Sequence, residues 1–396
     1  MPDPLTLLLV ALAALVSLFM AWVIGAGSAG ATPFAPAVGA NAISVLRAAF
    51  VVGLLAFLGA AVQGASISAA VGRGLVHGVT LSPMAAVVVL LLAGGLMAVG
   101  IATGIPIATA FTVTGAVIGI GLALGGTPAW AKYQQVGAVW LLTPVVGGGV
   151  AYGLARILSR EWMPERLSIP LLAGLVGGVV ANVELTLFAP PGESGSLATL
   201  VGSWLATAVP TFGLERLLVT ALAVVAATLV VGLDVRRDET GAMNRFLLAL
   251  GSLVAFSAGG SQVGLAVGPL LPLFDAVAVP LTAVLVGGGV GILIGAWTGA
   301  PRMIKSLSQD YSSLGPRRAI SALIPSFLIA QVAVLLGVPV SFNEIVVSAI
   351  VGSGMAITGG AGVSRRKLLR TVGAWIGSFV LAFGIGFGLY SGLEAL

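Results

Sequence analysis

The sequence predicts an all-α polytopic membrane protein of about twelve transmembrane helices, arranged as two inverted-topology repeats with re-entrant or broken helices. Three observations lead to this fold class. The chain is 58% hydrophobic and only 8% charged over 396 residues, whereas about a quarter of the residues of a soluble domain are charged. Apolar runs of about twenty residues, the length that crosses a bilayer, recur along the whole chain. Two separate motifs return at one constant offset, which indicates a duplication.

Composition also excludes several classes of function. The chain has no cysteine, one histidine (His77) and 13 acidic residues, so disulfides, thiol chemistry and a soluble metalloenzyme are not expected. No nucleophile–base pair or metal-ligand cluster is visible, and we therefore expect neither an enzyme nor a cofactor or metal. The pI near 10.1 does not indicate nucleic-acid binding, because the positive charges lie in short loops between apolar runs. The partner implied throughout is the lipid bilayer.

Twelve apolar segments account for almost the whole chain. They are expected near residues 5–26, 42–63, 82–103, 105–126, 133–157, 168–188, 214–232, 244–258, 277–299, 318–338, 339–362 and 371–391. The first run is long, has no basic residues before it and leads into a polar, glycine-rich motif, so it is not expected to be a cleavable signal peptide.

Basic residues orient these segments. If the N-terminus lies outside, 15 of the 18 basic residues fall in cytoplasmic loops, and only Arg73, Lys132 and Arg216 do not. The positive-inside rule therefore predicts a multi-pass protein of the plasma membrane with both termini outside.

Two motifs repeat at an offset of 233 residues. AGSAGATPFAP (26–36) falls on GGSQVGLAVGP (259–269), and GIPIATAFTVTGAVIGIGLALGG (104–126) falls on GVPVSFNEIVVSAIVGSGMAITG (337–359). The chain thus divides into a first repeat (1–160), a two-span connector (161–240) and a second repeat (241–396). Five spans in each repeat, an odd number, give the repeats opposite orientations, as in many secondary transporters.

The first motif raises the question of why apolar spans contain so many polar and small residues. Non-helical backbone is tolerated inside a membrane only where it is buried in protein or lines a wet cavity. We therefore expect the helix to break at 255–270, so that its backbone and side chains bind substrate. The alternative is that these glycines only allow close helix packing.

The two motifs resemble those of the inorganic phosphate transporter (PiT) family, which also includes sulfate permeases. AFSAGGSQVGLAVGPL and IGAGSAGATPFAPAVG resemble its duplicated GANDVANA-type signature, and GIPIATAF and GVPVSFNE resemble its second duplicated element. The tract SLGPRRAISALIPSF (313–327) and the tryptophans Trp140 and Trp375 also match the family pattern. The resemblance implies twelve spans, two re-entrant motif regions, and uptake of phosphate or sulfate coupled to sodium or protons.

The chain departs from that pattern at the residues that would bind sodium. The family aspartates fall at Ala29 and Gln262, and the family histidine falls at Phe111 and Glu344. What remains is a set of neutral hydrogen-bonding groups, which suit an oxyanion. The predicted substrate-binding residues are Ser28, Thr32, Ser261, Gln262, Thr109, Ser341 and Asn343. Glu344, the only acid within the four motifs, is predicted to couple transport to protons rather than sodium, or else to make a structural hydrogen bond.

The sequence therefore predicts a permease that moves inorganic phosphate by alternating access, with H⁺ or Na⁺ as the co-transported ion. The alternatives are a permease for sulfate or another oxyanion, an uncoupled anion channel, and a membrane enzyme or assembly factor that has kept the fold. The choice of anion, the coupling ion and the direction of transport stay open, and the oligomeric state is compatible with a homodimer.

Overall fold

The computed structural model describes residues 4–160, 163–189, 193–208, 213–358 and 362–394, and almost all of them are helical. The first part of the chain contains α1 (Pro4–Gly27), α2 (Ala35–Gly39), α3 (Val45–Gln63), α4 (Ala65–Arg73), α5 (Pro83–Thr103), α6 (Thr109–Ala123) and α7 (Trp130–Leu158). Two short antiparallel strands, β1 (Val76–His77) and β2 (Thr127–Pro128), join the loops that precede α5 and α7.

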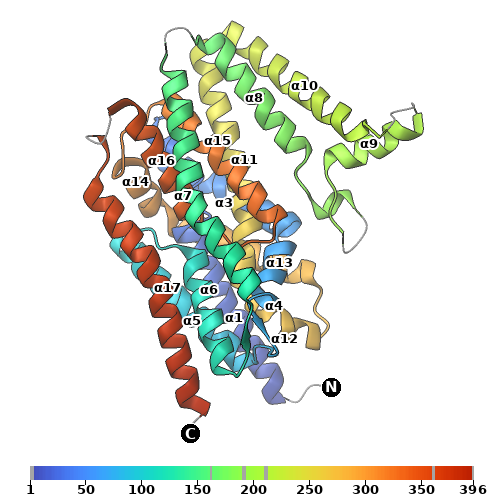
Figure 1. Ribbon diagram of the computed structural model, residues 1–396, viewed down its shortest axis with the longest axis vertical. Coiled ribbons are helices and arrows are strands. Elements are labelled where there is room, and N and C mark those ends of the chain that lie inside the picture. Colours follow the sequence, from blue (N-terminus) through green and yellow to red (C-terminus); the bar gives the residue numbers. More distant parts are fainter. Residues whose placement is uncertain (1–3, 161–162, 190–192, 209–212, 359–361, 395–396) are drawn as a thin grey trace.

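The last part of the chain contains corresponding helices in the same order, and the two strands have no counterpart in its described residues. These helices are α11 (Glu239–Val267), η2 (Gly268–Leu270), α12 (Leu271–Ala276), α13 (Leu281–Thr298), α14 (Ala300–Gln309), α15 (Pro316–Leu335), α16 (Phe342–Thr358) and α17 (Arg365–Glu394). At the offset of 233 residues, α1 falls on α11, α5 on α15 and α6 on α16. Figure 1 shows α1 and α7 rising from the lower end while α11 and α17 descend. We infer an inverted duplication from this correspondence.

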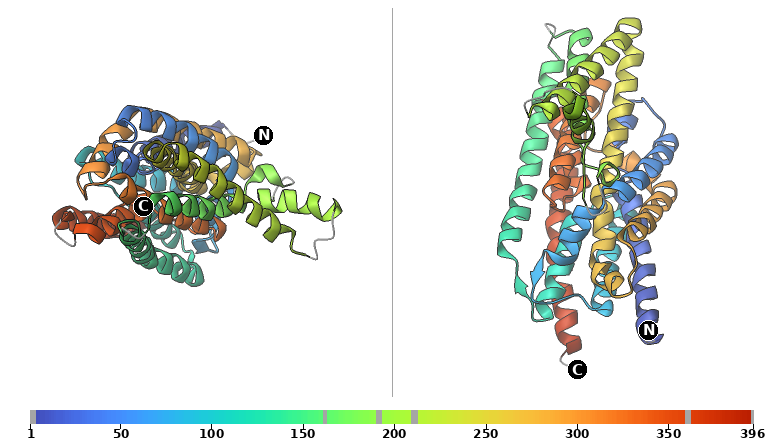
Figure 2. Two further views of the ribbon diagram at one scale, coloured as in Figure 1. Left: turned by 90° about the horizontal axis from the view of Figure 1, so that it is seen from above. Right: turned by 90° about the vertical axis from the view of Figure 1, so that its right-hand side faces the viewer.

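The connector lies at the side of this bundle. It consists of α8 (Glu165–Ala181), η1 (Thr186–Phe188), α9 (Leu197–Ala208) and α10 (Glu215–Arg237). Figure 2 shows α9 projecting away from the other helices. Ion pairs hold α8 and α10 to the bundle at the upper end: Arg317 of α15 pairs with Glu165, and Arg245 of α11 with Asp234.

The expected spans are largely reproduced, and three of them differ in length from the helices observed. In the described part of the chain, nine helices are long and apolar enough to cross a membrane, and α6, α9 and α16 are apolar but shorter. The expected spans 105–126 and 339–362 therefore begin with unwound segments, and their helices α6 and α16 have only 15 and 17 residues. The expected span 168–188 ends early, since α8 stops at Ala181.

The expected helix break at 255–270 is wrong. Helix α11 is continuous from Glu239 to Val267, so Ser261 and Gln262 lie in its interior, whereas α1 ends at Gly27 as a break requires. The two copies differ in this stretch: Pro33 of the first copy falls on Ala266 of the second, and a proline at 266 would remove an N–H from the interior of α11. The glycines of α11 serve packing instead, because a Cβ on Gly259 would lie 1.8 Å from the Ala56 carbonyl oxygen.

The two halves interlock through their helices. Helix α6 of the first half packs on α17 of the second, and α16 packs on α7. Glycines allow both contacts: a Cβ on Gly119 would lie 2.4 Å from the Phe383 carbonyl oxygen, and one on Gly352 would lie 2.0 Å from that of Gly148. Gly119 and Gly352 are equivalent in the repeat, so the same backbone contact occurs twice.

Gly352→Ala and Gly119→Ala should each destabilise the protein, because a methyl group would overlap backbone that has no room to move. Overpacking of this kind costs about 1–3 kcal/mol, which thermal unfolding in detergent would detect as a lower Tm. Gly149→Ala is the matched control, since nothing lies within 4 Å of a Cβ there and alanine is the better helix former. An unchanged Tm for Gly352→Ala would contradict the close contact.

Candidate anion site

Two helix breaks place the starts of α6 and α16 inside the bundle. Helix α5 gives way to Gly104 and an extended segment containing Pro106, after which α6 begins at Thr109. Helix α15 gives way to Gly337 and a segment containing Pro339, after which α16 begins at Phe342. We call residues 104–108 and 337–341 the unwound segments. The first N–H groups of each helix have no intrahelical partner and carry the positive end of its dipole.

Three of the predicted residues are linked directly by hydrogen bonds. Ser28 Oγ, just past the end of α1, donates to Gln262 Oε1 at 3.2 Å. Gln262 Nε2 in turn donates to the carbonyl oxygen of Val340 in the second unwound segment, at 2.7 Å. Thr32 Oγ1 donates to the Ser28 carbonyl oxygen at 3.1 Å. These bonds join the turn after α1 to α11 and to the break before α16.

Asn343 joins the two halves in the same region. Its Nδ2 donates to the carbonyl oxygen of Ile107, in the first unwound segment, at 2.6 Å and to that of Gly27 at 3.1 Å. Thr109 follows Ile107 by two residues, and Ser341 follows Val340. The structure therefore brings the residues predicted from the two motifs into one region of the bundle.

Ser261 belongs to this region through its helix face. Ser257, one turn earlier on α11, accepts a hydrogen bond from Gln331 Nε2 of α15 at 2.6 Å. Residues four apart lie on one face of a helix, so Ser261 faces the end of α15 and the second unwound segment.

Five polar atoms of the predicted residues are buried and have no hydrogen-bond partner. They are Thr109 Oγ1, Ser261 Oγ, Ser341 Oγ, Asn343 Oδ1 and Glu344 Oε2. A buried polar atom left without a partner costs about 1–3 kcal/mol, and such atoms call for an explanation, such as an unoccupied ligand site. Three hydroxyl donors beside two helix N-termini form a site whose chemistry suits an oxyanion.

The site is closed to solvent in this conformation. Every one of the predicted site residues, Glu344 included, is at most 2% exposed. Phe111, which takes the place of a family histidine, stacks on Trp140 with 3.8 Å between ring centroids. The two tryptophans bind the unwound segments: Trp140 Nε1 donates to the Pro339 carbonyl oxygen at 2.9 Å, and Trp375 Nε1 to that of Pro106 at 2.8 Å.

Sequence reasoning missed a buried polar chain that runs toward Ser261. Gln63 Nε2 donates to Gln331 Oε1 at 3.0 Å, and Gln331 donates to Ser257. Gln63 is buried at the end of α3, the helix that corresponds to the expected span 42–63. The available signal was Gln331 itself, a single amide within the apolar run LIAQVAVL of α15.

Comparison with known proteins agrees with this architecture. A family model described as the phosphate transporter family matches residues 24–386. A predicted phosphate permease of Thermococcus kodakarensis is 26% identical over 362 residues, covering 85% of this chain and 86% of that protein. The chloroplastic inorganic phosphate transporter 2-1 of Arabidopsis thaliana is 23% identical over 402 residues, covering 90% and 68%.

A solved structure has the same fold. The structure of a sodium-dependent phosphate transporter superposes with a TM-score of 0.80 at 22% sequence identity, and it covers 98% of this chain and 99% of that one. The likeness extends over both repeats and the connector, so it concerns the whole fold.

Ser261→Ala and Ser341→Ala should weaken binding of inorganic phosphate without lowering stability, because each removes a hydroxyl that has no protein partner. Loss of one hydrogen bond to a charged ligand costs about 1.5–3 kcal/mol, or roughly ten- to hundred-fold in Kd. Isothermal titration in detergent measures Kd, and thermal unfolding measures stability.

Ser326→Ala is the matched control for these variants. Ser326 is equally buried, but its hydroxyl donates to the Ala322 carbonyl oxygen within α15. It should leave Kd unchanged. Unaltered phosphate affinity in both Ser261→Ala and Ser341→Ala would refute the assignment.

Proposed function

Because the chain belongs to the phosphate transporter family, we propose that it carries inorganic phosphate across the membrane as a secondary transporter that works by alternating access. The single observation that carries this proposal is the group of buried, unpaired polar atoms at the starts of α6 and α16. A site made of neutral dipoles stabilises an anion without a fixed positive charge beside it, so it can also release that anion.

The hydrogen-bond inventory of the site favours phosphate over sulfate. Asn343 Oδ1 is an unpaired acceptor, and so is Glu344 Oε2 while the Glu344 carboxylate is ionised. The amide nitrogen of Asn343 is already bound to two carbonyl groups. Phosphate at neutral pH carries at least one proton that it can donate to such acceptors. Sulfate carries none, so it would leave them unpaired, at a cost of about 1–3 kcal/mol each.

Side-chain amides bind the backbone carbonyls of the site, and this favours coupling to protons over coupling to sodium. A sodium ion needs oxygen ligands, yet Val340 O is bound by Gln262 Nε2, and Gly27 O and Ile107 O are bound by Asn343 Nδ2. Gln262 also stands at the position of a family aspartate. Each amide NH₂ group uses a lone pair of a carbonyl oxygen and places partial positive charge where a cation would bind.

Glu344 is the proposed proton carrier. It is the third residue of α16, it is buried, and its Oε2 has no hydrogen-bond partner. A dianion that enters a cell held at −100 mV works against about 2.3 kcal/mol per charge. Uptake against that field requires co-transported cations, and protons carried on Glu344 and on phosphate itself meet the requirement.

We propose that the upper end in Figure 1 faces the cytoplasm, so that both termini lie outside the plasma membrane (Figure 1). The α7–α8 and α10–α11 junctions at that end contain Arg160, Arg166, Arg236 and Arg237, and basic loops remain inside. A cysteine at Ser194 should react with impermeant maleimide added to cells, whereas one at Gln309 should react only after the cells are opened. The reverse pattern would overturn this orientation.

In proteoliposomes, an inward proton gradient should drive accumulation of labelled phosphate and little accumulation of labelled sulfate. Replacement of external sodium by potassium should leave the phosphate flux unchanged, because amide groups donate to the carbonyl oxygens that a cation would use. Phosphate flux that requires sodium would end the proton proposal, and the absence of any phosphate flux would end the proposed function.

Glu344→Gln is the informative variant in the same assay. Glutamine keeps the size and hydrogen bonding of the side chain but cannot release a proton. The variant should therefore lose pH-driven accumulation and retain phosphate exchange between the two sides. Full pH-driven accumulation by Glu344→Gln would exclude Glu344 as the carrier.

A further inference from the structure

Two lysines hold backbone carbonyl groups at the beginning of the two unwound segments. Lys367 Nζ donates to the Gly104 carbonyl oxygen at 2.9 Å, and Lys132 Nζ donates to that of Gly337, also at 2.9 Å. Gly104 and Gly337 are equivalent in the repeat, and both have positive φ, 69° and 58°. Lys367 belongs to the second half and Lys132 to the first, so each lysine holds a segment of the opposite half. We call these contacts the Lys132 clasp and the Lys367 clasp.

The same helices hold the same segments at a second point. Lys132 and Trp140 of α7, and Lys367 and Trp375 of α17, are both separated by seven residues, and the two pairs lie 235 positions apart. The tryptophans bind the carbonyl groups of Pro339 and Pro106. Each unwound segment is therefore held by a lysine at its start and by a tryptophan two residues later.

The position of the lysines is unfavourable for their own helices. Each is the third residue of its helix, where a cation meets the positive end of the helix dipole. The hydrogen bond from each lysine to a glycine carbonyl group offsets this unfavourable interaction, because Gly104 and Gly337 follow the C-terminal ends of α5 and α15. Those ends carry unpaired carbonyl groups and the negative end of a dipole, which an ammonium group stabilises.

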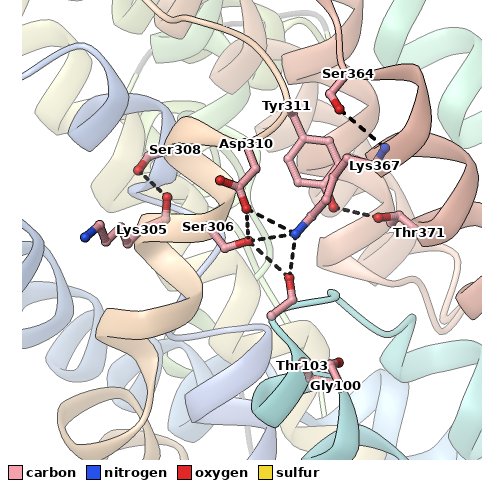
Figure 3. A network of polar contacts seen from close by, with 11 residues as sticks. Gly100, Thr103, Lys305, Ser306, Ser308, Asp310, Tyr311, Ser364, Lys367 and Thr371 are labelled. Atoms are coloured by element: carbon pink, nitrogen blue, oxygen red, sulfur yellow. Dashed lines mark hydrogen bonds and ion pairs between the residues drawn. The ribbon is translucent and has the colours of Figure 1, made fainter.

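The two clasps lie toward opposite ends of the molecule. In Figure 1, α17 begins beside α14 in the upper half, whereas α7 begins in the lower half. Figure 3 shows Lys367 between Asp310, Ser306 and Tyr311, with Lys305 pointing away from them. The segments that the clasps hold lead within four or five residues to Ser341 and Thr109, so a segment that swings free would uncover the site from one end only.

We propose that Lys132 and Lys367 are gating residues of the anion pathway. Release of the Lys132 clasp opens the site to the face that bears the termini, and release of the Lys367 clasp opens it to the opposite face. While both clasps hold, the site is closed on both sides, as the burial of its residues shows. This inference rests on the alternating-access transport proposed above.

The clasps differ in strength. Lys367 Nζ also bonds to Ser306 Oγ at 3.2 Å and to Asp310 Oδ2 at 3.1 Å, and Ser306 Oγ itself donates to the Gly104 carbonyl oxygen at 3.1 Å. The other partner of Lys132 is Gln135 Oε1, at 3.0 Å. Among the residues that the structure describes, no carboxylate forms an ion pair with Lys132. The Lys132 clasp is thus the weaker one, and its charge is available to an arriving oxyanion.

Site-directed labelling tests the proposal directly, because the native chain has no cysteine. Ser261→Cys places a thiol in the closed site, and an impermeant maleimide is added to one side of proteoliposomes at a time. Adding Lys132→Met should accelerate labelling from the side of the termini roughly ten-fold or more, as expected when a hydrogen bond to a charged group is lost. Adding Lys367→Met with Ser306→Ala should accelerate labelling from the opposite side.

Matched variants separate gating from a general loss of structure. Lys305→Met removes a lysine of α14 that lies outside the clasp and should change neither rate (Figure 3). Lys132→Arg and Lys367→Arg keep the donors and should restore slow labelling. If Lys132→Met fails to fold, Lys132→Gln gives a neutral side chain of similar polarity for the same measurement.

Two results would overturn the proposal: acceleration from both sides alike in either variant, or no acceleration in any of them. Labelling does not require phosphate to move. If each variant is labelled faster from one side only but the protein carries no phosphate, the proposed substrate is refuted and the gating role of the lysines is supported. If the protein carries phosphate but labelling is accelerated from both sides alike, the gating role is refuted and the proposed substrate is unaffected.

Discussion

The fold depends on one constraint: inside a bilayer, each backbone group released by a helix break must find a partner within the protein. Five carbonyl groups of the two unwound segments meet that requirement across the repeat boundary. The first segment is bound by Lys367, Trp375 and Asn343 of the second half, and the second by Lys132 and Trp140 of the first. The Val340 carbonyl group is bound from its own half by Gln262, and those of Ala108 and Ser341 are bound by the first turns of α6 and α16. Neither half could keep its break inside the membrane alone, so the interlocking of the halves and the formation of the site are one event.

Much of this architecture could be predicted from the sequence, because hydropathy and internal repetition are one-dimensional signals. The apolar segments and the internal repeat follow from counting and alignment, and so does the set of candidate site residues. Whether the helix breaks or continues at the glycine-rich motif cannot be predicted in this way, because glycines inside a span permit both a break and a close helix contact. A difference between the two copies was visible, since proline stands at position 33 and alanine at position 266, but its weight becomes clear only when the neighbours of α11 are known.

The lysine clasps could not be predicted from the sequence. Lys132 was an exception to the charge rule that orients the chain, and Lys367 was one of many basic residues that obey it. A contact between a side chain and a backbone carbonyl over 200 residues away leaves no periodicity and no motif. Only the matching K-x7-W spacing on α7 and α17 hints at it, and that spacing has no meaning before the unwound segments are placed beside those helices.

The proposed site is held together by side-chain amides. Where carbonyl oxygens converge, the amide groups of Gln262 and Asn343 supply partial positive charge. Helix α11 is continuous through Ser261, whereas α6 and α16 follow unwound segments in which side chains bind most of the carbonyl groups. Motion is cheapest in those segments, because releasing a clasp breaks a few side-chain contacts and leaves every helix intact. The close glycine contacts of α6 on α17 and of α16 on α7 involve backbone on both sides and offer no side chains that must repack. In the proposed mechanism α11 stays in place while the two unwound segments move separately, and the site therefore opens to one face at a time.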